Sequence, residues 1–233
     1  MEINGQRREE ALPGRQGRIL LAYSLLHRHD LITRDELIFA LWDDTPPRAV
    51  DSALGALLSK LRRALAPVPV DGCRVGLPAD AWVDLDAARA AIHRAESALT
   101  RTDYPTAWAA AQTTLFAARR GFLPTDDQPW IRQVRDELDG LRLRALETYA
   151  DAALRLGGTE LATAERAARE LVTLAPYRES AYRLLMKALA ARGNNAEALQ
   201  TYDDLLRRLL TDLGVGPSTE SRSLHTSLLH DTN

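Results

Sequence analysis

The feature of this sequence that most limits its possible folds is an internal repeat near the C-terminus. A set of small and apolar residues is followed 34 positions later by a matching set: Ala152, Ala164, Ala168, Leu171 and Pro176, and then Met186, Ala198, Tyr202, Leu205 and Leu210. A period of about 34 residues, with small side chains where two helices cross, is typical of tetratricopeptide arrays, whose helix pairs bury their apolar faces against their neighbours. The repeat predicts stacked antiparallel helices, which either offer a concave surface to a partner or merely pack.

The stretch before the repeat is also helical in pattern. We expect three helices there, over Asp86–Thr100, Thr106–Arg120 and Pro129–Gly157. The third repeats apolar residues close to heptad spacing, at Ile131, Val134, Leu138, Leu141, Ala145 and Tyr149, so one stripe of it is expected to be buried. Residues 86–233 are therefore predicted to form an all-α, tetratricopeptide-like domain.

Residues 1–85 have a different character. Asn4-Gly5 is a strong hairpin signal, and a helix is expected within "RQGRILLAYSLLHRHD". Thr33 and Glu36 form a capping-box pattern that starts a second helix, and Pro47 or Arg48 is expected to start a third. The segments "CRVGL" and "AWVDL" are predicted as two short strands. Three short helices followed by a small β-hairpin are the outline of a winged helix-turn-helix.

The third helix contains "SALGALLSKLRRAL" and has two unlike faces. On a helical wheel the leucines share one stripe with Val50, Ala53 and Ala64, which must face the core. The opposite face carries small or cationic residues, namely Arg48, Ser52, Gly55, Ala56, Ser59, Arg62 and Arg63, with Lys60 and Asp51 on its flanks.

Two interpretations of that face stay open on the residues alone. In the first, the helix lies in a DNA major groove: Arg48, Lys60, Arg62 and Arg63 contact phosphates, and Ser52 and Ser59 reach base edges or the backbone. Arg74 in the wing would add a minor-groove or phosphate contact. In the second, the small residues make room for a close helical neighbour, which would also explain a glycine in mid-helix.

No enzyme class is indicated. The sequence lacks the phosphate-loop, dinucleotide and metalloprotease motifs, and it has no paired cysteines. His27 and His29 are interpreted as partners of a helix C-terminus, Cys73 as a small strand residue, and Asp126-Asp127 as helix caps. We therefore expect no catalytic residues, no metal site and no cofactor.

Charge and composition set weaker limits. The net charge is −2, yet residues 48–65 hold four cations and only Asp51 as an anion, which is a modest basic footprint. No apolar run reaches the length of a membrane span, and the single cysteine fits a reducing cytoplasm.

The order of parts resembles a known family. "LPGRQGRILLAYSLL", "ITRDELIFALWDD" and "LLSKLRRAL" resemble the OmpR-type winged helix of the Streptomyces antibiotic regulatory proteins. The stretch "ALRLGGTELATAERAARELVTLAPYRESAYRLLMKALAARGNNAEALQTYDDLLRRLLTDLGVGPS" and the final "SLHTSLL" resemble the bacterial transcriptional activation domain that follows it in those proteins.

The resemblance implies a cytoplasmic bacterial transcription activator. By that resemblance, the protein would bind double-stranded promoter DNA and contact RNA polymerase holoenzyme. Family members bind DNA as dimers, so a homodimer is expected. Two departures stand out: Gly55 and Leu57 occupy positions that are usually polar in the family, and the chain starts partway through the family's N-terminal sheet. Either the true start lies upstream of Met1 or this sheet is reduced. The alternative is an interaction or ligand-sensing module whose winged helix no longer reads DNA.

Overall fold

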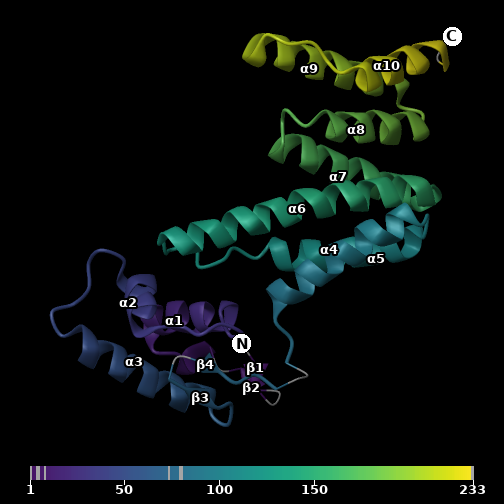
Figure 1. Cartoon of the computed structure of the whole chain (residues 1–233). Helices are drawn as coiled ribbons and strands as arrows, with labels where there is room; N and C mark the ends of the chain where they lie inside the picture. The colour runs from purple at the N-terminus through teal and green to yellow at the C-terminus, as the bar shows by residue number, and fades with distance from the viewer. Residues whose placement is uncertain (1, 4–5, 8, 73, 79–80, 232–233) are drawn as a thin grey trace. The chain divides into compact units, whose positions relative to one another are not determined.

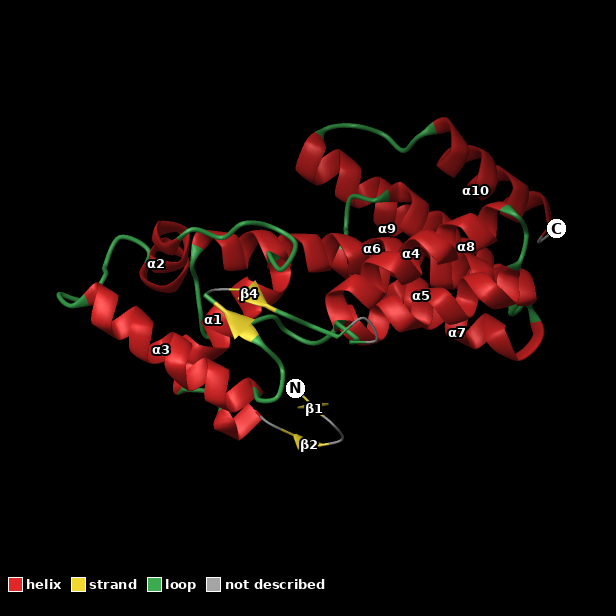
Figure 2. Cartoon of the chain, turned by 60° about the horizontal axis from the view of Figure 1, so that its bottom comes forward, coloured by secondary structure: helices red, strands yellow, loops and turns green. Residues whose placement is uncertain are grey.

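The computed structural model describes residues 2–3, 6–7, 9–72, 74–78 and 81–231 of the chain. Two compact units are present, and Figure 1 follows the chain through both. Unit 1 comprises Met1–Trp82 together with Gly121–Arg135, and unit 2 comprises Val83–Arg120 together with Asp136–Asn233. The architecture is mainly α-helical, as predicted, and the strands found among the described residues form two small hairpins (Figure 2).

The described residues of unit 1 before Val83 form three α-helices and two hairpins. In chain order its elements are β1 (Glu2–Ile3), β2 (Gln6–Arg7), a short 3-10 turn at Glu9–Ala11, α1 (Gly14–Leu26), α2 (Arg34–Trp42), α3 (Val50–Leu65), β3 (Val70–Asp71) and β4 (Arg74–Val75). β1 pairs antiparallel with β2, in the register Glu2↔Arg7 and Ile3↔Gln6, and β3 pairs likewise with β4. The Asn4-Gly5 turn itself lies outside the described residues.

The start of α2 is fixed by the capping box that the sequence predicts. The Thr33 hydroxyl accepts a hydrogen bond from the Glu36 backbone N–H at 3.2 Å, and the Glu36 carboxylate accepts from the Thr33 backbone N–H at 2.7 Å. Each residue satisfies a donor that the first turn of a helix leaves unpaired. α3 begins at Val50, slightly later than predicted, because Arg48 and Ala49 form a turn.

The β-hairpin of β3 and β4, the wing, contains one of the two predicted strands and not the other. "CRVGL" contains β4, but "AWVDL" is not a strand: Trp82 is exposed in a loop, and α4 (Asp84–Thr100) starts two residues later. The partner of β4 is β3, which directly precedes it. Gly72, between the two strands, has φ +55°, a left-handed conformation that allows the tight reversal. A strand immediately before a glycine turn therefore pairs in place of the more distant "AWVDL".

The core of unit 1 joins all three helices and the wing. Its buried residues are Ile19, Leu20, Leu21, Leu37, Leu41, Leu54, Leu58, Leu61, Leu65 and Val75. Leu123 and Trp130 of the 121–135 segment pack against this core. A piece of chain from beyond α4 and α5 therefore completes the hydrophobic core of unit 1.

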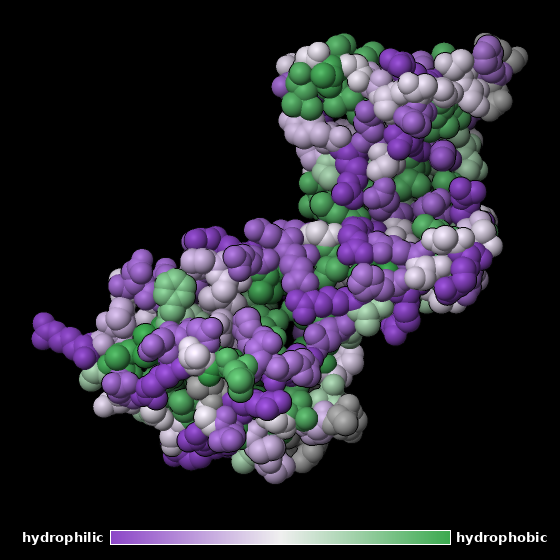
Figure 3. All heavy atoms as spheres, in the orientation of Figure 1, coloured by the Kyte–Doolittle hydropathy of each residue, from purple (hydrophilic) through white to green (hydrophobic). Residues whose placement is uncertain are grey.

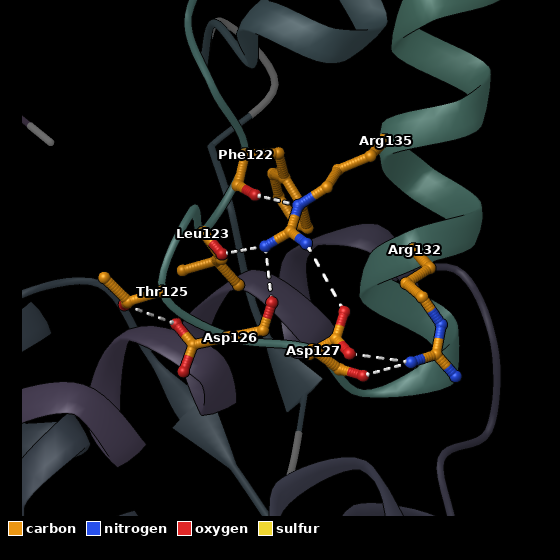
Figure 4. A network of polar contacts seen from close by, with 7 residues as sticks. All are labelled: Phe122, Leu123, Thr125, Asp126, Asp127, Arg132 and Arg135. Carbon is orange, nitrogen blue, oxygen red and sulfur yellow. Dashed lines mark hydrogen bonds and ion pairs between the residues drawn. The ribbon is translucent and has the colours of Figure 1, made fainter.

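The 121–135 segment is held in its turn by Arg135. The Arg135 guanidinium donates to the backbone carbonyl oxygens of Phe122, at 2.9 Å, and of Leu123 and Asp126 (Figure 4). Asp127 pairs with Arg132 at 2.9 Å. One side chain thus donates to three carbonyl groups of an irregular turn, of which that of Leu123 also accepts from the Asp126 backbone N–H at 3.0 Å.

Unit 2 is a stack of helices. Its elements are α4 (Asp84–Thr100), α5 (Tyr104–Ala118), α6 (Pro129–Leu156) from Asp136 onward, a 3-10 turn at Gly158–Glu160, α7 (Leu161–Leu174), α8 (Glu179–Ala191), α9 (Asn195–Leu213) and α10 (Thr219–Asp231). Figure 1 shows α6, α7, α8 and α9 following one another up the stack.

Alanines bring the helices of unit 2 close together. Ala88, Ala95 and Ala98 on α4, and Ala107 and Ala111 on α5, are fully buried. The predicted heptad stripe of α6 is buried or half-buried along its length. Of the five residue pairs in the 34-residue repeat, four are buried at both positions, whereas Pro176 is half-buried and Leu210 is 52% exposed. Small residues at the crossings therefore permit close packing, as the repeat predicts.

A group of exposed apolar residues lies at the C-terminal end of α9. Leu210, Leu213 and Val215 are each about half exposed. Apolar atoms gather at that end of the stack in Figure 3, whereas hydrophilic residues cover much of the rest of the face in view. Among the described residues, no helix has both the length and the apolar character needed to cross a membrane.

Candidate nucleic-acid interface

α3 has one face in the core and the other in solvent. Leu54, Leu58, Leu61, Ala64 and Leu65 are buried, as the helical wheel predicts. On the opposite side, Ser52, Gly55, Ala56 and Ser59 are all exposed. The core leucines therefore fix the rotation of α3 about its axis, and this rotation presents the row of small residues to solvent.

The space in front of Gly55 is open. A Cβ atom added at Gly55 would meet no described atom within 4 Å. Within the described residues of unit 1, the interpretation in which small residues admit a neighbouring helix therefore finds no such helix. The small side chains leave the backbone of α3 accessible to a partner from outside.

The N-terminal end of α3 is tied to α2 by an ion pair. The Arg34 Nε atom donates to the Asp51 carboxylate at 2.9 Å, and the Arg34 Nη2 atom donates to the Asp51 carbonyl oxygen at 3.1 Å. Asp51 is the one acidic residue between Arg48 and Leu65, and Arg34 lies outside that segment. The pair therefore compensates the only negative charge along this helix, and it orients the first turn of α3 against the first turn of α2.

The C-terminal end of α3 carries the cations. Lys60, Arg62 and Arg63 are exposed there, and Arg48 is exposed just before the helix. The Arg62 Nε atom donates to the carbonyl oxygen of Val70 in β3 at 3.0 Å. A guanidinium has five N–H donors, so this bond leaves others for a phosphate. Arg62 thus joins the end of α3 to the base of the wing while it presents positive charge.

The wing places a further cation in solvent. Arg74 is exposed on β4 and lies opposite Asp71 in the strand register, while Val75 is buried and anchors the hairpin to the core. Cys73 lies outside the described residues. The seven predicted contact residues therefore all have exposed positions on α3, just before it or on the wing: Arg48, Ser52, Ser59, Lys60, Arg62, Arg63 and Arg74.

Two histidines, His27 and His225, contact neighbouring side chains. The His27 Nδ1 atom lies 3.2 Å from the Asp30 carboxylate at the end of α1, and the His27 ring packs on Tyr23. His225 stacks on Tyr202, with ring centroids 4.0 Å apart. No cluster of three or more metal-ligating side chains occurs among the residues that the structure describes.

The expectation that Asp126 and Asp127 cap a helix is incorrect for Asp126. The Asp126 carboxylate is buried and forms an ion pair with Arg15 of α1. Asp127 is exposed and pairs with Arg132 and Arg135 in the first turns of α6. A buried carboxylate requires a charged partner, and Arg15 supplies one from a residue more than a hundred positions away. Sequence spacing alone does not reveal such a partner.

Sequence reasoning also missed the support that Trp130 gives to α2. The Trp130 indole N–H donates to the Ala40 carbonyl oxygen at 3.0 Å, and the Gln128 amide donates to the Leu41 carbonyl oxygen at 3.4 Å. Both carbonyl groups lie in the last turn of α2, where a helix leaves its acceptors unpaired. The Pro129-Trp130 dipeptide at a helix start was the available signal, but it does not identify the acceptor.

Comparisons with known proteins give a consistent result. Residues 83–229 match the family model described as the bacterial transcriptional activator domain. The chain is 34% identical to the regulatory protein AfsR of Streptomyces coelicolor over 92% of its own length, but it spans only 22% of that protein. It is 25% identical to the transcriptional regulatory protein MoaR1 of Mycobacterium bovis, covering 98% of this chain and 76% of that one.

A solved structure shares the fold. The chain superposes on Mycobacterium tuberculosis EmbR, a structure obtained in complex with a low-affinity phosphopeptide, with a TM-score of 0.80 and 21% identity. The match covers 99% of this chain and 62% of that one. The fold expected from the sequence is therefore confirmed over nearly the whole chain.

Proposed function

The chain belongs to the bacterial transcriptional activator domain family, and from this premise we propose that it regulates transcription, as an activator, by binding promoter DNA through unit 1. The family resemblance seen in the sequence is thereby confirmed. Relatives matched over nearly the whole of this chain are named as regulatory or transcriptional regulatory proteins. The chain spans about a fifth of the length of AfsR, and this match alone therefore does not assign the activity of the whole regulator to the chain. That activity is proposed here.

The observation that carries the proposal is the open face of α3. Its row of small residues is exposed, and the cations at its C-terminal end and on the wing are exposed with it. A helix of this kind enters a major groove with its backbone close to the DNA, while arginine and lysine side chains bind phosphates. Asn, Gln and mid-helix Arg, the usual base-reading side chains, are absent from the exposed face, so phosphate contacts and DNA shape carry most of the affinity.

The proposed contacts divide by role. Arg48, Lys60, Arg62 and Arg63 bind phosphates, Ser52 and Ser59 reach base edges or the sugar-phosphate backbone, and Arg74 contacts the DNA from the wing. Unit 2 contacts RNA polymerase holoenzyme or mediates homodimerisation, and the protein acts in the cytoplasm. The alternative is an interaction or ligand-sensing module without DNA binding, and it requires the α3 face to be covered by the helical domain or by a partner subunit.

A polarisation titration tests the DNA proposal. The probe is a labelled duplex from the chain's own upstream region, titrated at about 50 and 200 mM salt. The double variant Arg62→Ala with Arg63→Ala is expected to bind more weakly to all sequences. Its salt dependence should be shallower by roughly 0.9 in logarithmic slope for each phosphate that the variant no longer neutralises.

The matched control uses an adjacent pair of exposed arginines on a helix of unit 2, Arg207 and Arg208 of α9. Arg207→Ala with Arg208→Ala removes the same charge from unit 2 and should leave the affinity and the slope unchanged. If the Arg62 and Arg63 double variant binds like the wild type at both salt concentrations, the DNA-binding proposal is wrong.

A further inference from the structure

Unit 2 contains a groove that the DNA-binding proposal does not use. Its volume is about 610 Å³, and it lies between α5 and α7, with α6 beneath. The lining residues come from all three helices and from the end of α5: Gln112, Leu115 and Phe116 from α5, Arg119 and Arg120 directly after it, Leu146 and Tyr149 from α6, and Thr163, Arg166, Ala167 and Glu170 from α7.

The floor and one edge of the groove are apolar. Leu115, Leu146 and Ala167 are buried, and Tyr149 is half-buried and stacks on Trp108 with ring centroids 5.5 Å apart. At the edge, Phe116 is 60% exposed. A large aromatic side chain held in solvent beside an apolar floor is a feature of surfaces that bind a partner.

Positive charge surrounds this floor. The Arg120 guanidinium lies over the Phe116 ring, 4.4 Å from its centroid, and both side chains are exposed. Arg166 is also exposed, and it donates to the neutral Thr163 hydroxyl at 3.1 Å. The Phe116 ring and the Thr163 hydroxyl carry no negative charge, so these contacts leave the positive charges of Arg120 and Arg166 uncompensated.

The one acidic residue in the lining already has two cationic partners. Glu170 accepts from Arg119 and from Arg142, each at 2.6 Å. Partial burial opposes ionisation of Glu170, but these two hydrogen bonds and charges outweigh it and hold its pKa below the usual range. The groove therefore has three lining arginines against one carboxylate, and this carboxylate is shared with a fourth arginine.

We propose that this groove binds an acidic peptide segment of a partner protein that carries an apolar anchor residue. The anchor would lie on the Leu115, Leu146 and Ala167 floor beside Phe116. Flanking carboxylates of the segment would pair with Arg120 and Arg166. Both parts of the surface are needed, because the apolar floor selects the anchor and the cations select the flanking charge.

The apolar floor favours a peptide over a nucleic acid. A duplex presents phosphates and sugars to a surface of this kind, and these groups would leave the floor unfilled and would face the Glu170 carboxylate. The inference concerns unit 2 alone, so it stands whether or not α3 binds DNA.

The test uses the full chain and a fluorescein-labelled peptide of sequence DDEDLFDEDD, titrated by polarisation. Two further peptides separate the two parts of the recognition: DDEDSSDEDD lacks the anchor, and NNQNLFNQNN lacks the charge. We expect saturable binding of the first peptide only, weakened by added salt because exposed ion pairs are screened.

Three single variants locate the binding. Arg120→Glu and Arg166→Glu should each weaken the binding of DDEDLFDEDD by about tenfold or more, and Phe116→Ala by several-fold, because each variant removes a contact that the proposal assigns to the peptide. Arg94→Glu, an equal charge change at an exposed position of α4, is the control and should stay within about twofold of the wild type. Circular dichroism confirms that each variant folds.

Several results would overturn the inference. These are the absence of saturable binding up to millimolar peptide, equal binding of either control peptide, or an equal loss in Arg94→Glu. Loss of duplex DNA binding in the groove variants, with peptide binding unchanged, would instead identify the groove as a nucleic-acid surface.

Discussion

The indole N–H of Trp130 donates a hydrogen bond to the carbonyl oxygen of Ala40, with 3.0 Å between nitrogen and oxygen. Ninety residues of chain separate the two, and Trp130 lies in the first turn of α6. The Trp130 ring also makes edge contacts with Tyr23 and Phe122, at centroid distances of 5.2 and 5.9 Å. The winged-helix unit is therefore completed by residues that follow α4 and α5 in the sequence.

Replacing Trp130 by phenylalanine tests this contact. Trp130→Phe keeps an aromatic ring beside Tyr23 but leaves the Ala40 carbonyl without its donor, which should lower the free energy of unfolding by about 1–2 kcal/mol. The measurement is urea unfolding followed by far-UV circular dichroism.

Trp108 offers a matched control for that measurement. Its indole N–H is buried, and it has no hydrogen-bond partner among the described residues. Trp108→Phe removes the same atoms without breaking a hydrogen bond, so it should lower the free energy of unfolding by less than Trp130→Phe does. Equal losses in the two variants would contradict a stabilising role for the bond to Ala40.

Two substitutions at Gly55 test helix stability and DNA binding separately. Because its surroundings are open, Gly55→Ala should raise the free energy of unfolding by about 0.5–1 kcal/mol through helix propensity alone. Gly55→Glu adds bulk and negative charge to the face proposed to meet DNA, and it should weaken DNA binding at least tenfold, roughly the effect of 1.4 kcal/mol. Thermal melting and polarisation titration measure the two effects, and undiminished DNA affinity in Gly55→Glu would argue against this face of α3.

Arg62 and Arg63 are adjacent, but they are expected to act differently. Arg62 holds the wing through Val70, whereas both residues supply charge. Lysine keeps the charge but lacks the Nε donor in that position, so Arg62→Lys should weaken DNA binding by several-fold more than Arg63→Lys. The salt slope should stay close to the wild-type value in both variants, because each keeps its positive charge. Similar affinities for the two lysine variants would show that the bond to the wing has no role in binding.

Glu179 should make the stability of unit 2 depend on pH. Its carboxylate accepts from the Ser221 hydroxyl at 2.6 Å and from the Ser218 hydroxyl at 2.8 Å, which ties α8 to the start of α10. Partial burial opposes ionisation, but the bonds from Ser221 and Ser218 and the charge of Arg183 outweigh it and lower the pKa of Glu179 from its usual 4.5.

A lowered pKa means that the folded state favours the ionised carboxylate. Its stabilisation is present above pH 4.5, the usual pKa of the group, and is lost as the pH falls through the lowered value in the folded state. Glu179→Gln should therefore reduce the free energy of unfolding at pH 7 by about 1 kcal/mol, a value kept low because solvent screens a partly buried carboxylate, and the difference from wild type should shrink in acid. Asp203→Asn, at an exposed position on α9, serves as the control. A difference that is constant from pH 7 down to pH 3 would contradict the role assigned to the ionised carboxylate.

Sequence patterns were sufficient where the deciding contacts are local. The Thr33 and Glu36 capping box, the leucine stripe of α3 and the heptad stripe of α6 depend on residues three or four positions apart, which the helix itself brings together. The predicted strand at "AWVDL" was wrong because a strand also needs a partner strand. β4 already pairs with Val70 and Asp71, which the Gly72 turn places beside it.

By itself, the sequence determined that the chain is helical, that small residues line its helix crossings, and that the third helix has a leucine face and a small, cationic face. Only the tertiary structure decided that the described residues of unit 1 leave the small face open, that Arg62 contacts the wing, that Arg15 compensates the buried Asp126, and that residues 121–135 complete unit 1. The physical reason is that helical periodicity specifies which side chains share a face. What covers that face depends on residues far away along the chain, which become neighbours only when the core closes.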